Sequence, residues 1–268
     1  MSLLCKPKTP DEHGRIHDIA PSSSGLAYVG FSVHRLSAGQ SLSRATGDRE
    51  ACIVLLAGQA KASAGGRDFG EIGQRASIFE GTPPFALYAP PGSDWSVTAH
   101  TDIELGIGTA PAKGAYPPSL ITPEDIETAT RGTGTNLRHV NPILMDDRDA
   151  AESLLITEVF TPAGHWSSYP PHKHDADDFP NETLLEETYY HRIDPPQGFA
   201  FQRVYTDDRS LDETMSVYDG DVVKVPHGYH PCAAAHGYNL YYLNVMAGPL
   251  RQWRFRNEPD HDWIANTG

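Results

Sequence analysis

The sequence predicts an all-β fold made of two similar halves, and three observations support this prediction. The chain has 24 Gly and 22 Pro among its 268 residues, and so many turn-forming residues suit short strands better than long helices. Short apolar segments recur along the chain, each bounded by Gly, Pro, Ser or Asp. The order of turn residues in the first half also returns in the second half. We therefore expect two β domains in tandem.

The first half is expected to hold an N-terminal arm and one β domain. Residues 1–25 are polar and rich in Pro and Ser, which indicates a loose arm or an edge strand. Thr122 followed by Pro123 predicts the start of a short helix, because Thr caps helices and Pro suits the first helical position. The Gly-containing segment 131–135 separates the halves, so the first domain covers residues 26–130. Its strand candidates are 26–33, 51–57, 76–79, 85–89, 95–99 and 103–107.

The second half, residues 131–268, repeats this pattern and adds two long polar connections. The connections are residues 172–182 and 206–213, and polar loops on a strand scaffold are where functional residues tend to lie. We expect the end of the chain to close this second domain. Its strand candidates are 154–160, 187–193, 199–205, 215–218, 222–225 and 241–246.

Corresponding positions in the two halves differ in their chemistry. Each half contains two glycines that are eight residues apart. They are Gly73 and Gly81 in the first half, and Gly220 and Gly228 in the second. Glu50 and Glu187 each begin an apolar strand candidate. Two residues beyond the second Gly of each pair, however, the first half has a proline and the second half a histidine. We therefore expect the chemistry to lie in the second half.

Three histidines and a glutamate form the strongest candidate site. His172 and His174 are two residues apart, so on an extended segment both side chains point to the same side. Glu187 begins the next strand candidate, and His230 follows a Pro-x-Gly turn. Imidazole and carboxylate groups bind divalent metals, and a set of four leaves coordination positions open for a substrate. We expect one divalent ion, and these ligands are compatible with zinc, manganese, iron, nickel or cobalt.

This arrangement resembles the two-part signature of the cupins, a family of small β-barrels that hold a metal. The resemblance covers residues 150–247, and the first half is similar to a second cupin without the ligands. It implies a bicupin, with two tandem double-stranded β-helix (jelly-roll) barrels. Residues 26–130 would form a degenerate, metal-free cupin. Residues 131–268 would form the metal-binding catalytic cupin with a C-terminal closing segment.

The carboxylate ligand departs from the usual cupin spacing. The cupin glutamate normally follows the last histidine of its motif by a few residues, whereas Glu187 follows His174 by 13. Glu182 and Glu186 are therefore alternatives. We prefer Glu187 because it begins a continuous strand pattern.

Longer segments resemble the 5-deoxy-glucuronate isomerases, which are related to the 4-deoxy-5-threo-hexosulose-uronate ketol-isomerases. The similar segments are 164–175, 185–190, 198–206, 228–231 and 241–249. The resemblance implies a metal-dependent aldose–ketose isomerase, which is an intramolecular oxidoreductase. Its reaction would convert 5-deoxy-glucuronate to 2-deoxy-5-keto-gluconate in myo-inositol catabolism. A cupin dioxygenase and a non-catalytic sugar-acid binding protein are the alternatives.

Isomerisation moves a proton or a hydride between neighbouring carbons, and a proton route requires a base within hydrogen-bonding distance. Tyr189 and His191 share a strand face with Glu187, so these three are the catalytic candidates, beside a metal-bound water. The sequence does not rank them.

A uronic acid carries a carboxylate, so its binding site should offer a cation or hydrogen-bond donors. Arg203 is the first candidate, because a guanidinium binds a carboxylate with two parallel hydrogen bonds. Gln202 could bind a hydroxyl group. Lys173 lies between the two histidines of the motif and is expected to point the opposite way from them, which makes it the weaker candidate.

Composition excludes several other partners. The net charge is −14 and no run of basic residues is present, which argues against nucleic acid. No apolar segment is long enough to span a bilayer. Three dispersed cysteines and an N-terminus without a signal-peptide core suggest a cytoplasmic protein. We expect a small uronic-acid-type substrate as the partner, and the sequence leaves open whether the chain forms a homo-oligomer.

Overall fold

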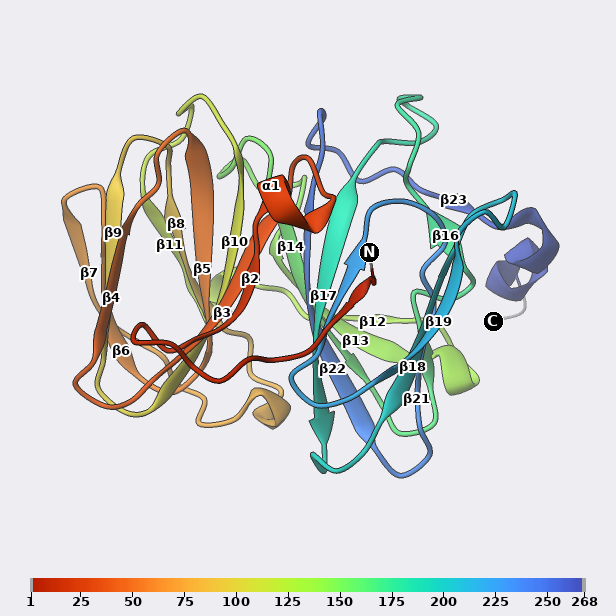
Figure 1. Ribbon diagram of the computed structural model, residues 1–268, viewed down its shortest axis with the longest axis horizontal. Helices are drawn as coiled ribbons and strands as arrows, with labels where there is room; N and C mark the ends of the chain where they lie inside the picture. The colour runs from red at the N-terminus through yellow and green to blue at the C-terminus, as the bar shows by residue number, and fades with distance from the viewer. Residues whose placement is uncertain (1, 267–268) are drawn as a thin grey trace. The chain divides into compact units, whose positions relative to one another are not determined.

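The computed structural model describes residues 2–266, and strands make up nearly all of its regular structure (Figure 1). The chain forms two compact units. The first barrel consists of residues 7–127 and 142–156. The second barrel consists of residues 2–6, 128–141 and 157–266.

Two antiparallel sheets form the first barrel and enclose its core. One has the order β11-β8-β5-β10-β3-β2, and the other β4-β9-β6-β7. Apolar side chains from both, such as Ile53 and Leu87 from the first and Leu42 and Val97 from the second, pack between them. The strands are β2 (Arg15–Ile19), β3 (Gly30–Leu36), β4 (Ser41–Ala45), β5 (Arg49–Ala57), β6 (Ala60–Ala64), β7 (Arg67–Ile72), β8 (Phe85–Ala89), β9 (Asp94–Ala99), β10 (Ile103–Pro111) and β11 (Ser119–Ile121). The short helix α1 (Pro21–Ser24) and the 3-10 turns η1 (Ile78–Glu80) and η2 (Pro123–Asp125) complete this unit.

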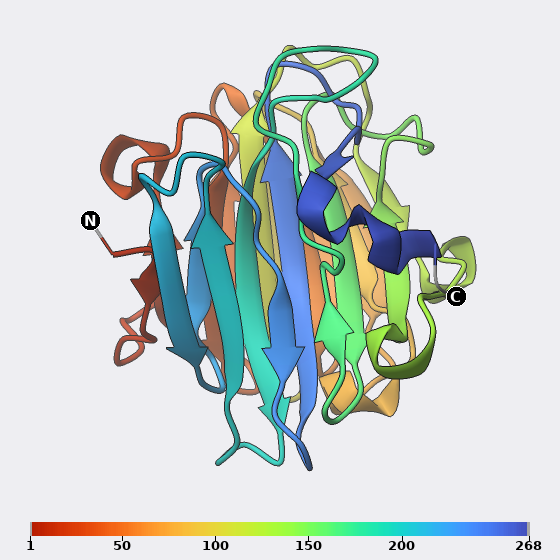
Figure 2. The ribbon, with the colours of Figure 1, turned by 90° about the vertical axis from the view of Figure 1, so that its right-hand side faces the viewer.

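The second barrel is built in the same way. Its larger sheet has the order β1-β20-β17-β22-β14-β13-β12, its smaller one β15-β21-β18-β19, and β16 pairs with β23. The core again draws on both main sheets, with Tyr189 and Val223 from the larger and Val204 and Met215 from the smaller. The strands are β1 (Leu4–Cys5), β12 (Ala129–Arg131), β13 (Arg138–Leu144), β14 (Leu155–Thr161), β15 (Trp166–Ser167), β16 (His172–Lys173), β17 (Glu186–Asp194), β18 (Ala200–Tyr205), β19 (Asp212–Val217), β20 (Val222–Val225), β21 (Cys232–Ala234), β22 (Asn239–Ala247) and β23 (Arg256–Asn257). Two 3-10 segments, η3 (Gly134–Asn136) and η4 (Pro259–Asn266), complete the unit, and η4 is dark blue in Figure 2.

The predicted all-β fold is confirmed, whereas the chain is divided differently from the prediction. Residues 2–25 do not form a separate arm and instead supply edge strands, the alternative that the sequence left open: β1 pairs with β20 of the second barrel, and β2 pairs with β3 of the first. Both lie at the edges of their sheets. Residues 142–156, which the sequence assigned to the second domain, group with the first barrel, and this segment includes the end of β13 and the start of β14.

The predicted helix after Thr122 is only the single turn η2. The Asp125 carboxylate accepts hydrogen bonds from the Thr122 amide at 2.8 Å and from its hydroxyl at 2.8 Å, so the start is capped as expected. The backbone of Ile126 is already extended, and β12 follows and pairs with β13. Strand pairing therefore ends the helix after one turn.

Candidate metal centre

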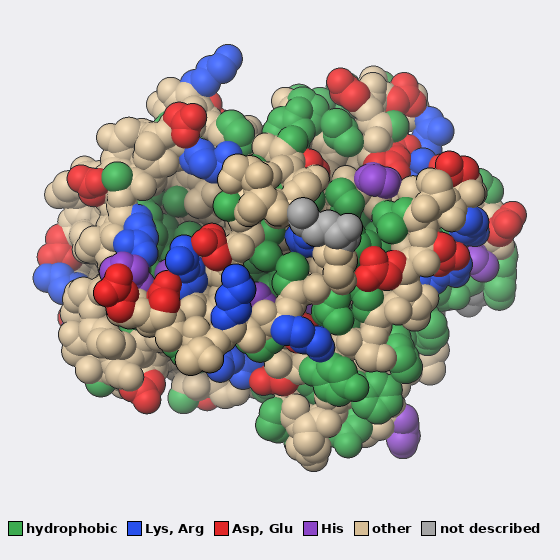
Figure 3. All heavy atoms as spheres, in the orientation of Figure 1, with side chains coloured by type: hydrophobic (Ala, Val, Ile, Leu, Met, Phe, Trp, Pro, Cys, Tyr) green, Lys and Arg blue, Asp and Glu red, His purple; other side chains and the backbone are tan. Residues whose placement is uncertain are grey.

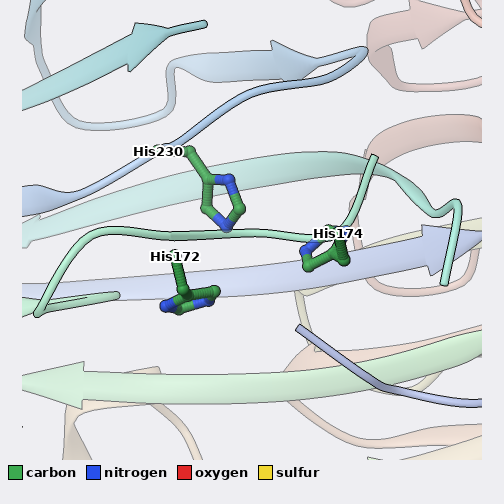
Figure 4. Close-up of side chains that lie close together, drawn as sticks. All are labelled: His172, His174 and His230. Atoms are coloured by element: carbon green, nitrogen blue, oxygen red, sulfur yellow. The ribbon is translucent and has the colours of Figure 1, made fainter. Parts of the chain in front are cut away.

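Three histidines of the second barrel converge at one point (Figure 4). His172 lies in β16, His174 directly follows that strand, and His230 lies between β20 and β21. Their ligand nitrogens lie within 4.8 Å of one another. His230 is fully buried and His174 is 2% exposed, so the cluster lies inside the barrel.

Backbone carbonyls orient two of these rings. The Nδ1 of His174 lies 3.0 Å from the Leu185 carbonyl oxygen, and the Nδ1 of His230 lies 2.8 Å from the Gly228 carbonyl oxygen. A carbonyl can only accept, so each Nδ1 carries the proton and each Nε2 keeps its lone pair. Both Nε2 atoms are buried, and among the described residues the polar group that they face is the carboxylate of Glu187. A metal ion would satisfy them, and a backbone carbonyl that accepts from the other ring nitrogen is typical of metal-binding histidines.

Glu187 completes the donor set. Its Oε1 contacts the Nε2 of His174 and lies 3.5 Å from the Nε2 of His230. Its Oε2 accepts a hydrogen bond of 2.7 Å from the Asn244 amide. Burial alone would raise the pKa of Glu187, but the neighbouring imidazoles lower it well below its usual range. The carboxylate is therefore ionised and directed at the histidines.

The electrostatics of the histidines also suit a metal. Burial lowers the pKa of His172 and that of His230, which keeps both imidazoles neutral. Burial would lower the pKa of His174 as well, but the Glu187 carboxylate raises it. His172 and His230 are therefore in the neutral form that binds a divalent cation, and a bound cation would replace the proton that Glu187 favours on His174.

The structure distinguishes Glu187 from its two alternatives. Glu186 precedes it on the same strand, so its side chain points to the opposite face. The Oε1 of Glu182 accepts hydrogen bonds from the amides of Asp175 and Ala176 at 2.8 and 3.1 Å. Glu182 thus holds the loop that follows His174, and Glu187 is the carboxylate that faces the histidines.

Tyr189 and His191 lie along the same inward face of β17. The ring of Tyr189 lies 5.9 Å from that of His230, and its hydroxyl lies 3.1 Å from the Ser168 hydroxyl. His191 stacks on Tyr189 on the side away from Glu187, and burial lowers its pKa to about 4. Gln202 is also buried: its Oε1 lies 2.8 Å from the Nε2 of His191. Gln202 therefore holds His191 in place.

The two predicted cationic substrate contacts point away from the cluster. Arg203 lies on the opposite face of β18 from Gln202 and binds Asp212 with two hydrogen bonds of 2.7 Å. Lys173 binds Asp175 at 3.1 Å and Asp207 at 2.7 Å. Alternation along a strand sends every second side chain outward, so neither cation is directed at the histidines.

Sequence reasoning missed several residues near the cluster. Asn244 orients Glu187, and its signals were a polar residue inside an apolar strand candidate and a place in segment 241–249, which resembles the isomerases. Phe255 lies over His172 with ring centroids 4.8 Å apart, and Trp253 lies 6.4 Å from it. This chain end reaches His172 because β23 pairs with β16, which no local pattern predicts.

A pair of arginines was missed as well. Arg131 on β12 and Arg138 on β13 are direct cross-strand neighbours. The guanidinium of Arg131 lies over the ring of Trp253 at 5.3 Å, and that of Arg138 donates to the backbone and side-chain oxygens of Asn136. Within residues 2–266, neither arginine forms an ion pair with an acid. Like charges placed opposite each other destabilise a sheet unless an anion binds between them.

Nearly the whole chain matches one known protein family. The model of the KduI/IolB family matches residues 3–264. The chain belongs to the KduI/IolB family. The family match confirms the resemblance seen in the sequence.

Relatives within the family agree with this result. The chain is 52% identical to the 5-deoxy-glucuronate isomerase of Geobacillus kaustophilus over 268 residues, covering 100% of this chain and 97% of that protein. It is 46% identical to the protein of the same name from Bacillus subtilis over 265 residues, covering 98% of each. These relatives are isomerases by name, so the predicted enzyme class is confirmed.

Solved structures support the fold. An IolB-like protein from Salmonella typhimurium superposes with a TM-score of 0.95 at 52% identity, covering 98% of this chain and 99% of the other. The oxalate decarboxylase of Lactobacillus farciminis, only 13% identical, superposes with a TM-score of 0.69 and covers 100% of this chain and 91% of the other. The predicted bicupin fold is thereby confirmed. No helix in residues 2–266 is long and apolar enough to cross a membrane.

Proposed function

We propose that this protein is a metal-dependent aldose–ketose isomerase that converts 5-deoxy-glucuronate to 2-deoxy-5-keto-gluconate in myo-inositol catabolism. One observation carries the proposal. Buried Nε2 atoms converge beside an ionised glutamate, in a chain half identical to proteins named 5-deoxy-glucuronate isomerase. The name of the relatives supports the proposed substrate, and the set of donor atoms supports the proposed metal.

The metal would be one divalent ion held by His172, His174, Glu187 and His230. When bound, it supplies a Lewis acid that stabilises negative charge on the oxygens of the reacting carbons. Zinc, manganese, iron, nickel and cobalt all suit three imidazoles and a carboxylate. The protein's own part is to hold these donors in place through Leu185, Gly228 and Asn244.

Tyr189 is the candidate for contact with the reacting part of the substrate. Its ring packs against His230, and its hydroxyl is bonded to Ser168, so the phenol is held at the edge of the cluster. From there it can orient a substrate hydroxyl or take part in the proton transfer. His191 and Gln202 lie behind it and fix its position through the stacked rings.

The substrate carboxylate is assigned to Arg131 and Arg138 in place of Arg203. Both arginines are cross-strand neighbours without an acidic partner among the described residues. Trp253 links Arg131 to the histidines, because its ring contacts both Arg131 and His172. A carboxylate bound between the two guanidiniums would place the sugar chain over the cluster.

The function is tested by following ketose formation from 5-deoxy-glucuronate by NMR under anaerobic conditions, with metal content measured on the same sample. We expect turnover without oxygen, which a dioxygenase would not show. His230→Ala should lose bound metal and at least about a thousandfold in turnover. His227→Ala is the matched control, because His227 is exposed in the same turn. A fully metal-loaded protein that forms no ketose would exclude the isomerase.

The carboxylate site has its own test. Arg138→Gln should raise KM about tenfold, because a charge-assisted hydrogen bond to the substrate is lost. Arg203→Gln serves as the control and should leave KM unchanged. A raised KM in Arg203→Gln with an unchanged KM in Arg138→Gln would instead assign the substrate carboxylate to Arg203.

A further inference from the structure

The first barrel contains a cavity of its own. Its volume is about 230 Å³, and it opens where β2, β3, β5 and β10 meet the smaller sheet at β4 and β9. Figure 3 shows basic, acidic and His side chains around a hollow on this face, over the region of β2, β3 and β5. The cavity lies at the mouth of the barrel, because Ala51, Ile107 and Trp95 belong both to its lining and to the apolar core.

Cations dominate this lining. Arg15, Arg44 and Arg49 all line the cavity, against a single acid, Asp18. Arg15 is already neutralised, since it binds Asp18 at 2.7 Å and Asp11 at 3.1 Å. The other two arginines form no ion pair within residues 2–266. This concentration of positive charge contrasts with the net charge of −14 for the whole chain.

The two remaining guanidiniums bond only to neutral groups. Arg49 is partly buried and donates to the backbone oxygens of Tyr28 and Thr109 and to the Thr109 hydroxyl. Arg44 has one long contact, 3.5 Å to the Ser43 carbonyl oxygen. Arg49 holds its charge in a partly buried position without an anion, and Arg44 is exposed in the same lining. An oxyanion can bind a guanidinium with two parallel hydrogen bonds.

Neutral polar and aromatic groups complete the cavity. His34 is 3% exposed, and its two nitrogens lie 3.0 Å from the His13 carbonyl oxygen and 3.3 Å from the Ser32 hydroxyl. Trp95 offers an aromatic surface to the body of a ligand. Pockets for drug-sized ligands have about 300–1,000 Å³, so a cavity of this size would accept only a small molecule.

We propose that this cavity of the first barrel binds a small oxyanion, the carboxylate of a sugar acid or a phosphate group, between Arg44 and Arg49. The degenerate barrel is thus a second ligand site, separate in its residues from the histidine cluster. The assignment rests on the charges and geometry of the first barrel alone and holds whatever reaction the second barrel performs.

The test is calorimetric titration of the full chain with inorganic phosphate and, separately, with D-glucuronate at constant ionic strength. We expect at least one of them to bind, and Arg44→Gln to weaken that binding about tenfold or more. Arg44 is exposed, so its replacement should not disturb folding. Arg67→Gln is the matched control: this arginine of the same barrel lies over Phe69, away from the cavity, and its replacement should leave binding unchanged.

A second variant guards against an indirect effect of Arg44→Gln. Ser32→Asp places a carboxylate in the cavity lining and should abolish binding by repulsion. If Arg44→Gln and Ser32→Asp lose binding of phosphate but not of glucuronate, the ligand is a phosphate group. If they lose binding of glucuronate, the ligand is a carboxylate. Binding of neither probe to the unmodified protein, or equal binding by Arg44→Gln, would overturn the proposal.

Discussion

The two barrels use corresponding strands for opposite charges. In the second barrel, β17 directs Glu187 and then Tyr189 and His191 into the interior. In the first, β5 directs Arg49 into the cavity, while Glu50, one residue later, points to the other face. A shift of one residue along a strand moves a side chain to the opposite face of the sheet. The same architecture can therefore present a carboxylate that faces histidines in one barrel and a cation in the other.

Glu50 lies on the face of β5 that is turned away from the cavity, and there it has a structural role. Its carboxylate is fully buried and accepts a hydrogen bond of 2.8 Å from the Tyr88 hydroxyl. It also accepts hydrogen bonds from the amides of Glu152, Ser153 and Leu154 at 2.9, 2.8 and 2.7 Å. The sequence gives Glu50 and Glu187 similar positions, but the first fastens a loop of its barrel and the second faces the histidines.

Replacing Glu187 by Gln should give the largest effect. The change removes the charged member of the donor set, and we expect turnover to fall by at least about a thousandfold with loss of bound metal. Steady-state kinetics and metal analysis measure this. Glu50→Gln is the paired control and should keep metal and turnover per folded molecule. Equal loss of turnover in both variants would contradict the different roles assigned to Glu187 and Glu50.

Glu50→Gln should instead lower the free energy of unfolding by about 3 kcal/mol. A Gln amide cannot accept all the hydrogen bonds that the carboxylate accepts, so buried backbone donors are left without partners. Urea unfolding of chelator-treated protein measures the change without a contribution from metal binding. Glu124→Gln, at an exposed acid of the same barrel, should change stability little. A loss below about 1 kcal/mol would show that Glu50 does not fasten the loop.

Asn244→Leu tests whether Asn244 orients Glu187 in the candidate metal site. The substitution keeps the side-chain volume but removes the hydrogen bond of 2.7 Å to Glu187. Residues that orient metal ligands contribute roughly 10–100-fold in metal affinity, and we expect a loss in that range. Competition with a chelator of known affinity measures it. An unchanged affinity would mean that Glu187 is oriented by the histidines alone.

Arg203→Gln should give the smallest effect. Arg203 is 41% exposed and its partner Asp212 is 35% exposed, and exposed ion pairs contribute below about 1 kcal/mol. We expect a change in stability within that limit, measured by thermal unfolding. A loss of several kcal/mol would assign to this ion pair a structural role that its exposure does not suggest.

The sequence predicted the histidine cluster well because its signals are local. His172 and His174 lie on one extended segment, and their spacing alone puts both on one side. Glu187 and His230 were found through a family pattern that keeps the same order along the chain. Asn244, Trp253 and Arg138 carry no such pattern, since each reaches the site through pairing with a distant strand or segment. For the N-terminal edge strands β1 and β2, the pairing partners likewise come from the tertiary structure.

The sequence by itself determined the strand-rich fold, the repeat of two barrels and the residues of the candidate metal site. Only the tertiary structure decided which face of each strand is the interior. That choice turned Arg203 outward to Asp212, placed Arg131 opposite Arg138, and gathered Arg44 and Arg49 at the mouth of the first barrel. The physical reason is that alternation along a strand defines two faces, while packing against the opposite sheet selects which of them is buried.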